Sequence, residues 1–290
     1  MREKVLIIGC GDIGCGVGVE LASKQYTIIG AKRSPDTLPD CIQAILLDVT
    51  NPSDFESLPQ DINRIIYVVS ADTYADESYG LAYVNGIRNT LAWMNRSLID
   101  AKSIIFVSST SVYHQQDGGM VDEQSLTLPQ SFSGQRMLEA EQYVQQSGFS
   151  HSIVRFSGIY GPGRNRLIKQ VAAGKGCVRK PVYWTNRIHR DDCIGFLVHL
   201  VERHTSNAGV DAIYIVSDSE PVPMWEIKNW LRNEMGVALT VGWSEADFSG
   251  KQNKRCVNKS MLVSGYQLKY PSYKEGYLSL VKAFKSEHVR

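Results

Sequence analysis

The chain has 290 residues, of which 43% are hydrophobic and 21% are charged. These fractions are typical of a globular protein, so they exclude a disordered chain, a collagen-like chain and a small disulfide scaffold. The 31 basic and 30 acidic side chains leave a formal net charge of +1. This balance gives no electrostatic argument for binding to nucleic acid or to an anionic membrane.

The six cysteines are scattered along the chain, and none forms a Cys-x-x-Cys pair. We therefore expect neither a metal site nor a disulfide framework. The apolar run Val5–Ile8 is too short for a signal peptide, and no run approaches the roughly 20 apolar residues of a membrane helix. The sequence predicts a soluble cytoplasmic protein with reduced thiols.

Short apolar runs alternate with helical patterns through the first half of the chain. The pattern predicts strands at 5–8, 27–29, 44–47, 65–69, 103–107 and 152–156. It predicts helices at 13–24, 79–98 and 132–146, with a further helix start after 51–53. Strands separated by helices imply right-handed crossovers, so we expect an α/β fold with a doubly wound parallel sheet.

The second half of the chain is less regular. Helices are expected at 192–203, 224–235 and 273–285, and a strand at 212–216. Loops are expected at 161–163 and 174–181, where glycine and proline gather. We expect a large domain at 1–160 with returning segments at about 185–217, and a small α+β C-terminal domain made of 161–184 and 218–290.

A glycine-rich turn follows the first predicted strand and opens the first predicted helix. It reads Gly9-Cys10-Gly11-Asp12-Ile13-Gly14, which is Gly-x-Gly-x-x-Gly. The first glycine makes a tight turn, the second lets a pyrophosphate approach the backbone, and the third lets the helix pack on the strand. The helix N-terminus then offers N–H groups and a positive dipole to the phosphates. We therefore predict a dinucleotide site that includes Gly9, Gly11, Asp12, Ile13 and Gly14.

The end of the second strand bears on the choice between NAD and NADP. NAD-binding proteins place an acid there for the ribose 2′-hydroxyl, whereas this chain has Lys32 and Arg33. Asp36 follows Ser34-Pro35 and so falls past the strand end. A guanidinium can hold a 2′-phosphate through two hydrogen bonds, so we predict a preference for NADP, with NAD as the alternative. The competing interpretation is that Lys32 and Arg33 form a solvated loop.

Several further motifs, in order and at proper spacing, resemble the extended short-chain dehydrogenase/reductase superfamily, also called the NAD-dependent epimerase/dehydratase family. They are Leu47-Asp48-Val49, Tyr83-Val84-Asn85-Gly86, the fifth-strand segment 106–113, the segment Arg155 to Gly163, and Ile188-His189-Arg190-Asp191-Asp192. Residues 270–276 resemble an atypical, YeeZ-like subgroup. The resemblance implies a Rossmann domain and a small substrate domain.

The resemblance also implies roles for individual residues. Asp48 and Val49 would contact the adenine, and Ser70, Ala71 and Asn85 would line the cofactor site. Ser109 matches the catalytic serine that binds a substrate carbonyl or alcohol, although a turn-capping role fits equally well. Tyr113 belongs to the same signature, as a residue that lines the substrate site or supports the fold. His189 is expected to be packed and hydrogen-bonded, with no metal-ligand spacing among the histidines.

The catalytic helix departs from the family pattern. The family carries Tyr-x-x-x-Lys, and the matching positions here are Phe132 and Arg136. Phe132 has no proton to transfer, and such transfer is worth roughly 10²–10⁴-fold in rate. Arg136 keeps the hydrogen-bond donors that the family's lysine offers to the nicotinamide ribose. Thr110 and Ser111 stand where sugar-nucleotide 4,6-dehydratases carry an Asp-Glu pair, which argues against that reaction.

Two functions remain open. The first is an NAD(P)-dependent epimerase/dehydratase-like oxidoreductase that acts on a sugar nucleotide or a related carbonyl compound. The second is a catalytically degenerate NAD(P)-binding sensor or scaffold, which the Phe132 and Arg136 replacements favour. By analogy with the family, the helices at 79–98 and 132–146 would form a homodimer. A basic stretch at Lys251, Lys254, Arg255 and Lys259 is either a solvated loop or an anion contact.

Overall fold

The structure is a computed structural model that describes residues 2–97, 102–238 and 252–288. The chain divides into two compact units, and each is described by itself. Unit 1 comprises Met1–Val112, Thr127–Arg155 and Ile194–Tyr214, and unit 2 comprises Tyr113–Leu126, Phe156–Cys193 and Ile215–Arg290. The segment 113–126 therefore groups with unit 2, although it lies inside the range 1–160.

The strands are β1 (Lys4–Ile8), β2 (Thr27–Lys32), β3 (Ile42–Leu46), β4 (Arg64–Tyr67), β5 (Ser103–Ser109), β6 (Met120–Val121), β7 (His151–Phe156), β8 (Gly158–Tyr160), β9 (Trp184–Thr185), β10 (Arg187–His189), β11 (Ile213–Val216), β12 (Val222–Pro223) and β13 (Arg255–Cys256). The α-helices are α1 (Asp12–Ser23), α2 (Asp76–Tyr79), α3 (Gly86–Arg96), α4 (Phe132–Gln146), α5 (Arg166–Ala172), α6 (Arg190–Thr205), α7 (Met224–Met235), α8 (Lys259–Val263) and α9 (Tyr273–His288).

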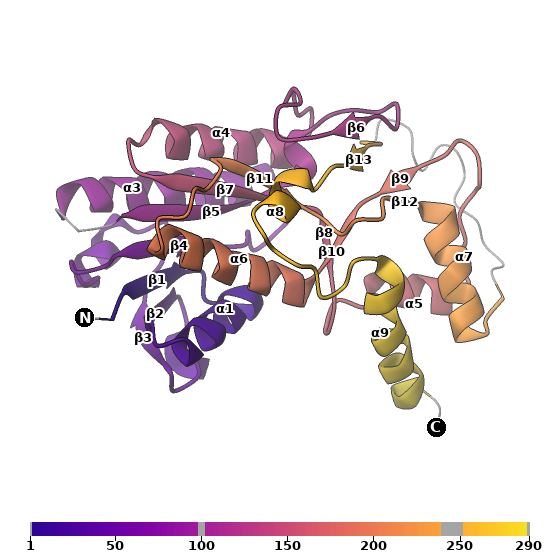
Figure 1. Cartoon of the computed structure of the whole chain (residues 1–290), viewed down its shortest axis with the longest axis horizontal. Helices are drawn as coiled ribbons and strands as arrows, with labels where there is room; N and C mark the ends of the chain where they lie inside the picture. The colour runs from indigo at the N-terminus through magenta and orange to yellow at the C-terminus, as the bar shows by residue number, and fades with distance from the viewer. Residues whose placement is uncertain (1, 98–101, 239–251, 289–290) are drawn as a thin grey trace. The chain divides into compact units, whose positions relative to one another are not determined.

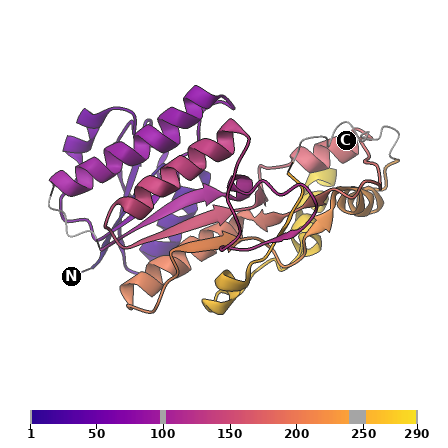
Figure 2. The same cartoon turned by 90° about the horizontal axis from the view of Figure 1, so that it is seen from above.

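Within the described residues, seven strands form one sheet in the order β11-β7-β5-β4-β1-β2-β3. The central strand β1 pairs in parallel with β2 and β4, and the pairs β2–β3 and β4–β5 are also parallel. Helices α3 and α4 lie side by side on one face, and α1 and α6 lie on the other (Figures 1 and 2). The predicted Rossmann-type α/β fold is confirmed.

The parallel sheet explains the apolar runs in the sequence. Val5, Leu6, Ile7 and Ile8 of β1 are fully buried because helices cover both faces of the strand. The carboxyl ends of β1, β2, β4 and β5 lie at one edge of the sheet. That edge is where ligands of open α/β sheets bind.

Two predicted helices take a different form. The segment after Asn51 is a 3₁₀-helix at Pro52–Ser57, which ends just before Pro59. The helix expected at 79–98 is α2, a π-helical segment at Gly80–Asn85, and α3. The Tyr67 hydroxyl donates a hydrogen bond to the Ala82 carbonyl inside the π segment. No periodicity argument could foresee this bond, since it depends on a buried strand beneath the helix.

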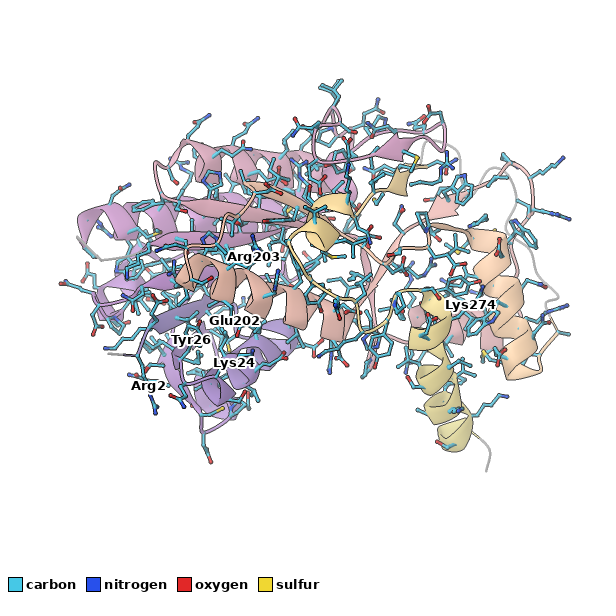
Figure 3. All side chains as sticks on the ribbon, in the orientation of Figure 1. Arg2, Lys24, Tyr26, Glu202, Arg203 and Lys274 are labelled. Atoms are coloured by element: carbon cyan, nitrogen blue, oxygen red, sulfur yellow. The ribbon has the colours of Figure 1, made fainter. Side chains whose placement is uncertain are left out.

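Helix α6 is tied to the end of α1 at the surface of unit 1. Lys24 and Glu202 form an ion pair at 2.6 Å, and the Tyr26 hydroxyl lies 3.2 Å from Thr205 Oγ1. Figure 3 labels Lys24, Tyr26 and Glu202. No helix in the described ranges has the length and apolar character needed to cross a membrane.

Unit 2 is built from short strand pairs and helices. Strands β8 and β10 pair in parallel, as do β6 and β13, whereas β9 and β12 are antiparallel. The core of this unit gathers residues from α5, α7 and α9 around Tyr160, Tyr273 and Tyr277.

A buried charge network joins α4 to the sheet in unit 1. Glu141 is 0% exposed and Arg155 is 3% exposed. Arg155 donates to both Glu141 oxygens, at 3.0 and 2.6 Å, and the Ser108 hydroxyl donates to Glu141 Oε1 at 2.5 Å. The network therefore fixes α4 against both β5 and β7.

Glu141→Gln should lower the free energy of unfolding by about 3–5 kcal/mol, because it leaves the Arg155 charge buried without its counter-ion. Urea unfolding would measure the loss. Glu139→Gln is the matched control on the same helix, since Glu139 pairs with Arg136 at the surface. This control should cost less than about 1 kcal/mol. Equal losses from the two variants would show that the buried pair does not stabilise the fold.

His204 should make stability depend on pH. Its ring is 6% exposed and lies 3.2 Å from Ser152 Oγ. Burial, helped by Arg64 and His151, lowers the pKa of His204 from 6.5 to about 4. At a pH between these two pKa values, His204 is protonated in the unfolded chain but remains neutral in the folded chain. The free energy of unfolding should therefore fall by up to about 3 kcal/mol as the pH drops from 6.5 to 4. A His204→Gln variant that kept the full wild-type slope would contradict this assignment.

Candidate functional site

The glycine turn after β1 has the geometry that a dinucleotide requires. Gly9 has φ +91°, and a side chain there would approach the Val69 amide nitrogen to 2.6 Å. A side chain at Gly14 would approach the Gly9 carbonyl oxygen to 2.8 Å, so Gly14 allows α1 to pack on the turn. At Gly11 the nearest such contact is 3.9 Å away. The backbone is thus open at the glycine that a pyrophosphate must approach, and the residues present fit the cofactor.

Two cysteines lie within this turn and the start of α1. The Cys10 and Cys15 sulfurs are 3.8 Å apart, and the Cys15 thiol donates to the Cys10 carbonyl at 3.3 Å. Burial, together with the neighbouring Cys15, raises the pKa of Cys10 to about 12. The Cys10 thiol therefore remains protonated at neutral pH and packs as an apolar group.

Arg33 lies at the carboxyl end of β2, where the adenosine ribose of a dinucleotide would lie. Its guanidinium donates to both oxygens of Asp72, at 2.7 and 2.5 Å, and lowers the pKa of that carboxyl. Asp72 follows β4, so this ion pair joins the ends of two strands. Both side chains are 59% exposed, so the arginine is held in place while it remains open to a ligand.

Four of the other residues predicted to bind the cofactor follow strands β3 and β4. Asp48 follows β3, and its Oδ1 accepts from the Thr50 amide at 2.9 Å. The Val49 carbonyl accepts from Asn89 Nδ2 of α3 at 2.8 Å. Ser70 and Ala71 follow β4, and Ser70 is exposed. Asn85 is exposed at the end of the π segment, so it faces away from the core.

Ser109 ends β5, and its hydroxyl oxygen accepts from the Ser111 amide at 3.1 Å. The hydroxyl therefore caps the turn, as one of its two predicted roles requires. Its proton remains able to donate to a ligand. Because Ser108 is held by Glu141, the position of Ser109 is fixed by the buried charge network.

Phe132 begins α4 and is surrounded by tyrosines. The Phe132 ring centroid lies 4.8 Å from that of Tyr74 and 5.5 Å from that of Tyr79. The Tyr74 hydroxyl is 3.4 Å from Ser133 Oγ. Tyr83 packs behind Tyr79 at 5.2 Å, and burial raises its pKa to about 12. Sequence reasoning missed Tyr74, because nothing in its spacing links it to position 132.

Arg136 is paired with two acidic side chains. Its guanidinium donates to both oxygens of Asp76, at 2.8 and 3.1 Å, and to Glu139 at 2.9 Å. These carboxylates raise its pKa further and keep it charged. In this structure the arginine therefore ties α2 to α4. Its predicted contact with the nicotinamide ribose stays a prediction.

Tyr113 and Lys254 belong to unit 2. Tyr113 is fully buried, and its carbonyl accepts from Lys254 Nζ at 3.3 Å. Lys254 is 5% exposed, and burial lowers its pKa to about 8. The solvated-loop interpretation of the basic stretch is therefore wrong for Lys254, because its ammonium is held by a carbonyl in the interior. Lys251 lies outside the described residues.

The Ile-His-x-Asp-Asp motif is built into the interior of unit 2. The His189 ring packs on Tyr270 at 3.8 Å and accepts from the Asp191 amide at 3.2 Å. Asp192 accepts from the amides of Lys269 and Tyr270. The packed, hydrogen-bonded histidine agrees with its predicted role.

Asp218 is a second buried acid in unit 2, and no sequence motif marks it. It is 1% exposed, and its Oδ2 has no hydrogen-bond partner. Burial raises its pKa to about 8. Across the described residues, no group of three or more histidine, cysteine or acidic side chains is placed to hold a metal ion.

Comparison with known proteins identifies the family of the chain. The family model described as NAD(P)H-binding matches residues 9–203. Protein YeeZ of Escherichia coli (strain K12) is 28% identical over 214 residues, which cover 69% of this chain and 73% of that protein.

Solved structures agree with this result. A protein from Methylobacillus flagellatus, provisionally described as an NAD-dependent epimerase/dehydratase, is 35% identical with a TM-score of 0.79, over 98% of this chain and 100% of that one. UDP-glucuronic acid 4-epimerase from Bacillus cereus, solved with NAD, shares the fold at 21% identity and a TM-score of 0.78, over 98% and 99% of the two chains. The chain therefore belongs to the NAD(P)H-binding family, among the extended short-chain dehydrogenase/reductase-like proteins.

Proposed function

We propose that the protein is an NADP(H)-dependent oxidoreductase of the epimerase/dehydratase type that acts on a sugar nucleotide or a related carbonyl compound. The glycine turn, the start of α1 and the residues at the carboxyl ends of β2 to β4 would hold the cofactor. When bound, this cofactor supplies hydride transfer. Ser109 would donate its hydroxyl proton to the carbonyl oxygen of the substrate and so orient it.

The observation that carries the proposal is the pair of features found at the carboxyl edge of the sheet. It brings together an open glycine backbone at Gly11 and an oriented guanidinium at Arg33. The first suits a pyrophosphate, and the second suits a 2′-phosphate, because a guanidinium carries five N–H groups and Asp72 accepts from only two of them. The preference for NADP over NAD rests on Lys32 and Arg33, which stand at the end of β2 where NAD-binding proteins carry an acid.

Arg33→Ala should weaken NADPH binding about tenfold to a hundredfold, because a charge-assisted hydrogen-bonded pair is worth roughly 1.5–3 kcal/mol. NADH binding should change little. Calorimetric titration with each cofactor measures both constants. Lys24→Ala is the matched control, since Lys24 is also an ion-paired surface cation and caps the opposite end of α1 from the glycine turn. Equal NADPH affinity in Arg33→Ala and wild type would refute the 2′-phosphate contact.

Ser109→Ala tests the catalytic half of the proposal. Wild-type protein would be assayed with NADPH against carbonyl compounds and sugar nucleotides. Loss of the hydroxyl should reduce kcat by roughly a hundredfold or more and leave NADPH affinity unchanged. An unchanged kcat would restrict Ser109 to its turn-capping role.

Two observations favour the alternative, a cofactor-binding sensor or scaffold. Phe132 offers no proton, and Arg136 is engaged by Asp76 and Glu139. Tight NADPH binding without turnover on any substrate of the panel would support this alternative. The homodimer through the surfaces of α3 and α4 stays a prediction, for which sedimentation analysis is the test.

A further inference from the structure

The loop between β4 and α2 places a phenol against the ring that replaces the family's catalytic tyrosine. We propose that Tyr74 supplies the hydroxyl that position 132 lacks and acts as the proton donor to the substrate. This inference rests on the proposed function, because a proton donor matters only where a carbonyl is reduced. It gives a chemical role to a residue that no motif marks.

The geometry separates Tyr74 from the other two tyrosines near Phe132. Tyr74 is 72% exposed, and its hydroxyl lies near Ser133 Oγ at the start of α4. Tyr83 is 7% exposed, and its hydroxyl accepts from the Ala71 amide. Tyr79 is half-buried, and its ring packs edge-on to Phe132 at 89°. Tyr74 therefore combines direct contact with Phe132 and a ring that a substrate can reach.

Two ion pairs hold the loop that carries Tyr74. Asp72 is bound by Arg33 at the end of β2, and Asp76 is bound by Arg136 on α4. Tyr74 lies midway between these two acids in the sequence. Anchoring on both sides limits how far the phenol can swing, as a catalytic group requires. In this arrangement Arg136 serves the site by positioning the loop rather than by replacing a lysine at the ribose.

The location also suits the chemistry. Tyr74 follows the carboxyl end of β4, the edge that holds the glycine turn and Ser109. In the step proposed, Tyr74 Oη would donate its proton to the carbonyl oxygen. NADPH held at the glycine turn would supply the hydride that the carbonyl carbon takes up, so that the carbonyl would be reduced to an alcohol and the cofactor oxidised. The phenolate then recovers its proton from water.

The first test needs no substrate. The protein would be labelled with 3-fluorotyrosine at its 14 tyrosines, and the Tyr74 resonance assigned by its loss in Tyr74→Phe. NADP⁺ should shift this fluorine signal, because the charged nicotinamide lies close to it. Adenosine 2′,5′-bisphosphate, which lacks the nicotinamide half, should not. The Tyr79 resonance, assigned with Tyr79→Phe, is the internal comparison and should shift less. A Tyr74 signal that responds equally to both ligands would overturn the proposal.

The second test measures turnover with the best substrate of the panel. Tyr74→Phe keeps the ring contact with Phe132 and removes only the hydroxyl, so kcat should fall roughly 10²–10⁴-fold with NADPH affinity unchanged. Tyr79→Phe, the matched control, should keep wild-type kcat. Phe132→Tyr in the Tyr74→Phe background restores a phenol at the adjacent position and should recover at least tenfold of the loss.

The outcomes separate this inference from the proposed function. If wild-type protein binds no NADPH, the proposed function fails, and the role of Tyr74 fails with it. If NADPH binds but Tyr74→Phe matches Tyr79→Phe in kcat, only the role of Tyr74 is overturned. If NADPH binds and no substrate of the panel is turned over, the sensor or scaffold alternative is favoured and the proton-donor role of Tyr74 is overturned, whatever position the fluorine experiment gives the phenol.

Discussion

Glu141 and Arg155 carry opposite charges in a part of unit 1 that water does not reach, and each needs the other to remain there. Their pairing, completed by Ser108, leaves α4 one arrangement against β5 and β7. Phe132 lies about two and a half helical turns before Glu141, so the network also fixes the start of that helix. Ser109 follows Ser108 directly. The buried charge network therefore aligns the start of α4 with the end of β5, although none of its residues takes part in the proposed chemistry.

The loop after β4 shows how a site can shift its chemistry while it keeps its scaffold. The cofactor-binding features depend on backbone geometry, as at Gly9 and Gly14, and substitutions there meet hard steric limits. Proton donation depends on a single hydroxyl group, and a neighbouring side chain can place such a group in nearly the same position. Loss of a tyrosine from α4 therefore does not by itself end the function of such a fold.

Sequence patterns predicted the helices and turns whose form depends on residues close together in the chain. The ranges 132–146 and 224–235 match α4 and α7, because apolar periodicity and clear end signals agree there. The glycine turn was recognisable because its first and third glycines meet steric limits, whereas Gly11 leaves the backbone open to a ligand. The partners of Arg33 and Arg136 could not be foreseen, since Asp72 and Asp76 lie 39 and 60 residues away. The burial of Lys254 escaped prediction for the same reason.

The π-helical segment before α3 has a consequence for how this chain tolerates insertions and deletions. A π turn holds one more residue than an α turn, and each residue of an α-helix advances by about 100°. Deleting one residue from Gly80–Asn85 would restore regular α-helix with α3 in nearly the same orientation, because the π turn takes up the extra residue without rotating the helix that follows. Ile87 and Leu91 would therefore keep facing the core, whereas a deletion within α3 itself would rotate the residues that follow by about 100°. The Tyr67 hydroxyl donates to the Ala82 carbonyl of the π segment, and a side chain at position 86 would occupy the space of that hydroxyl. The extra residue of the π segment and Gly86 therefore have to be kept together.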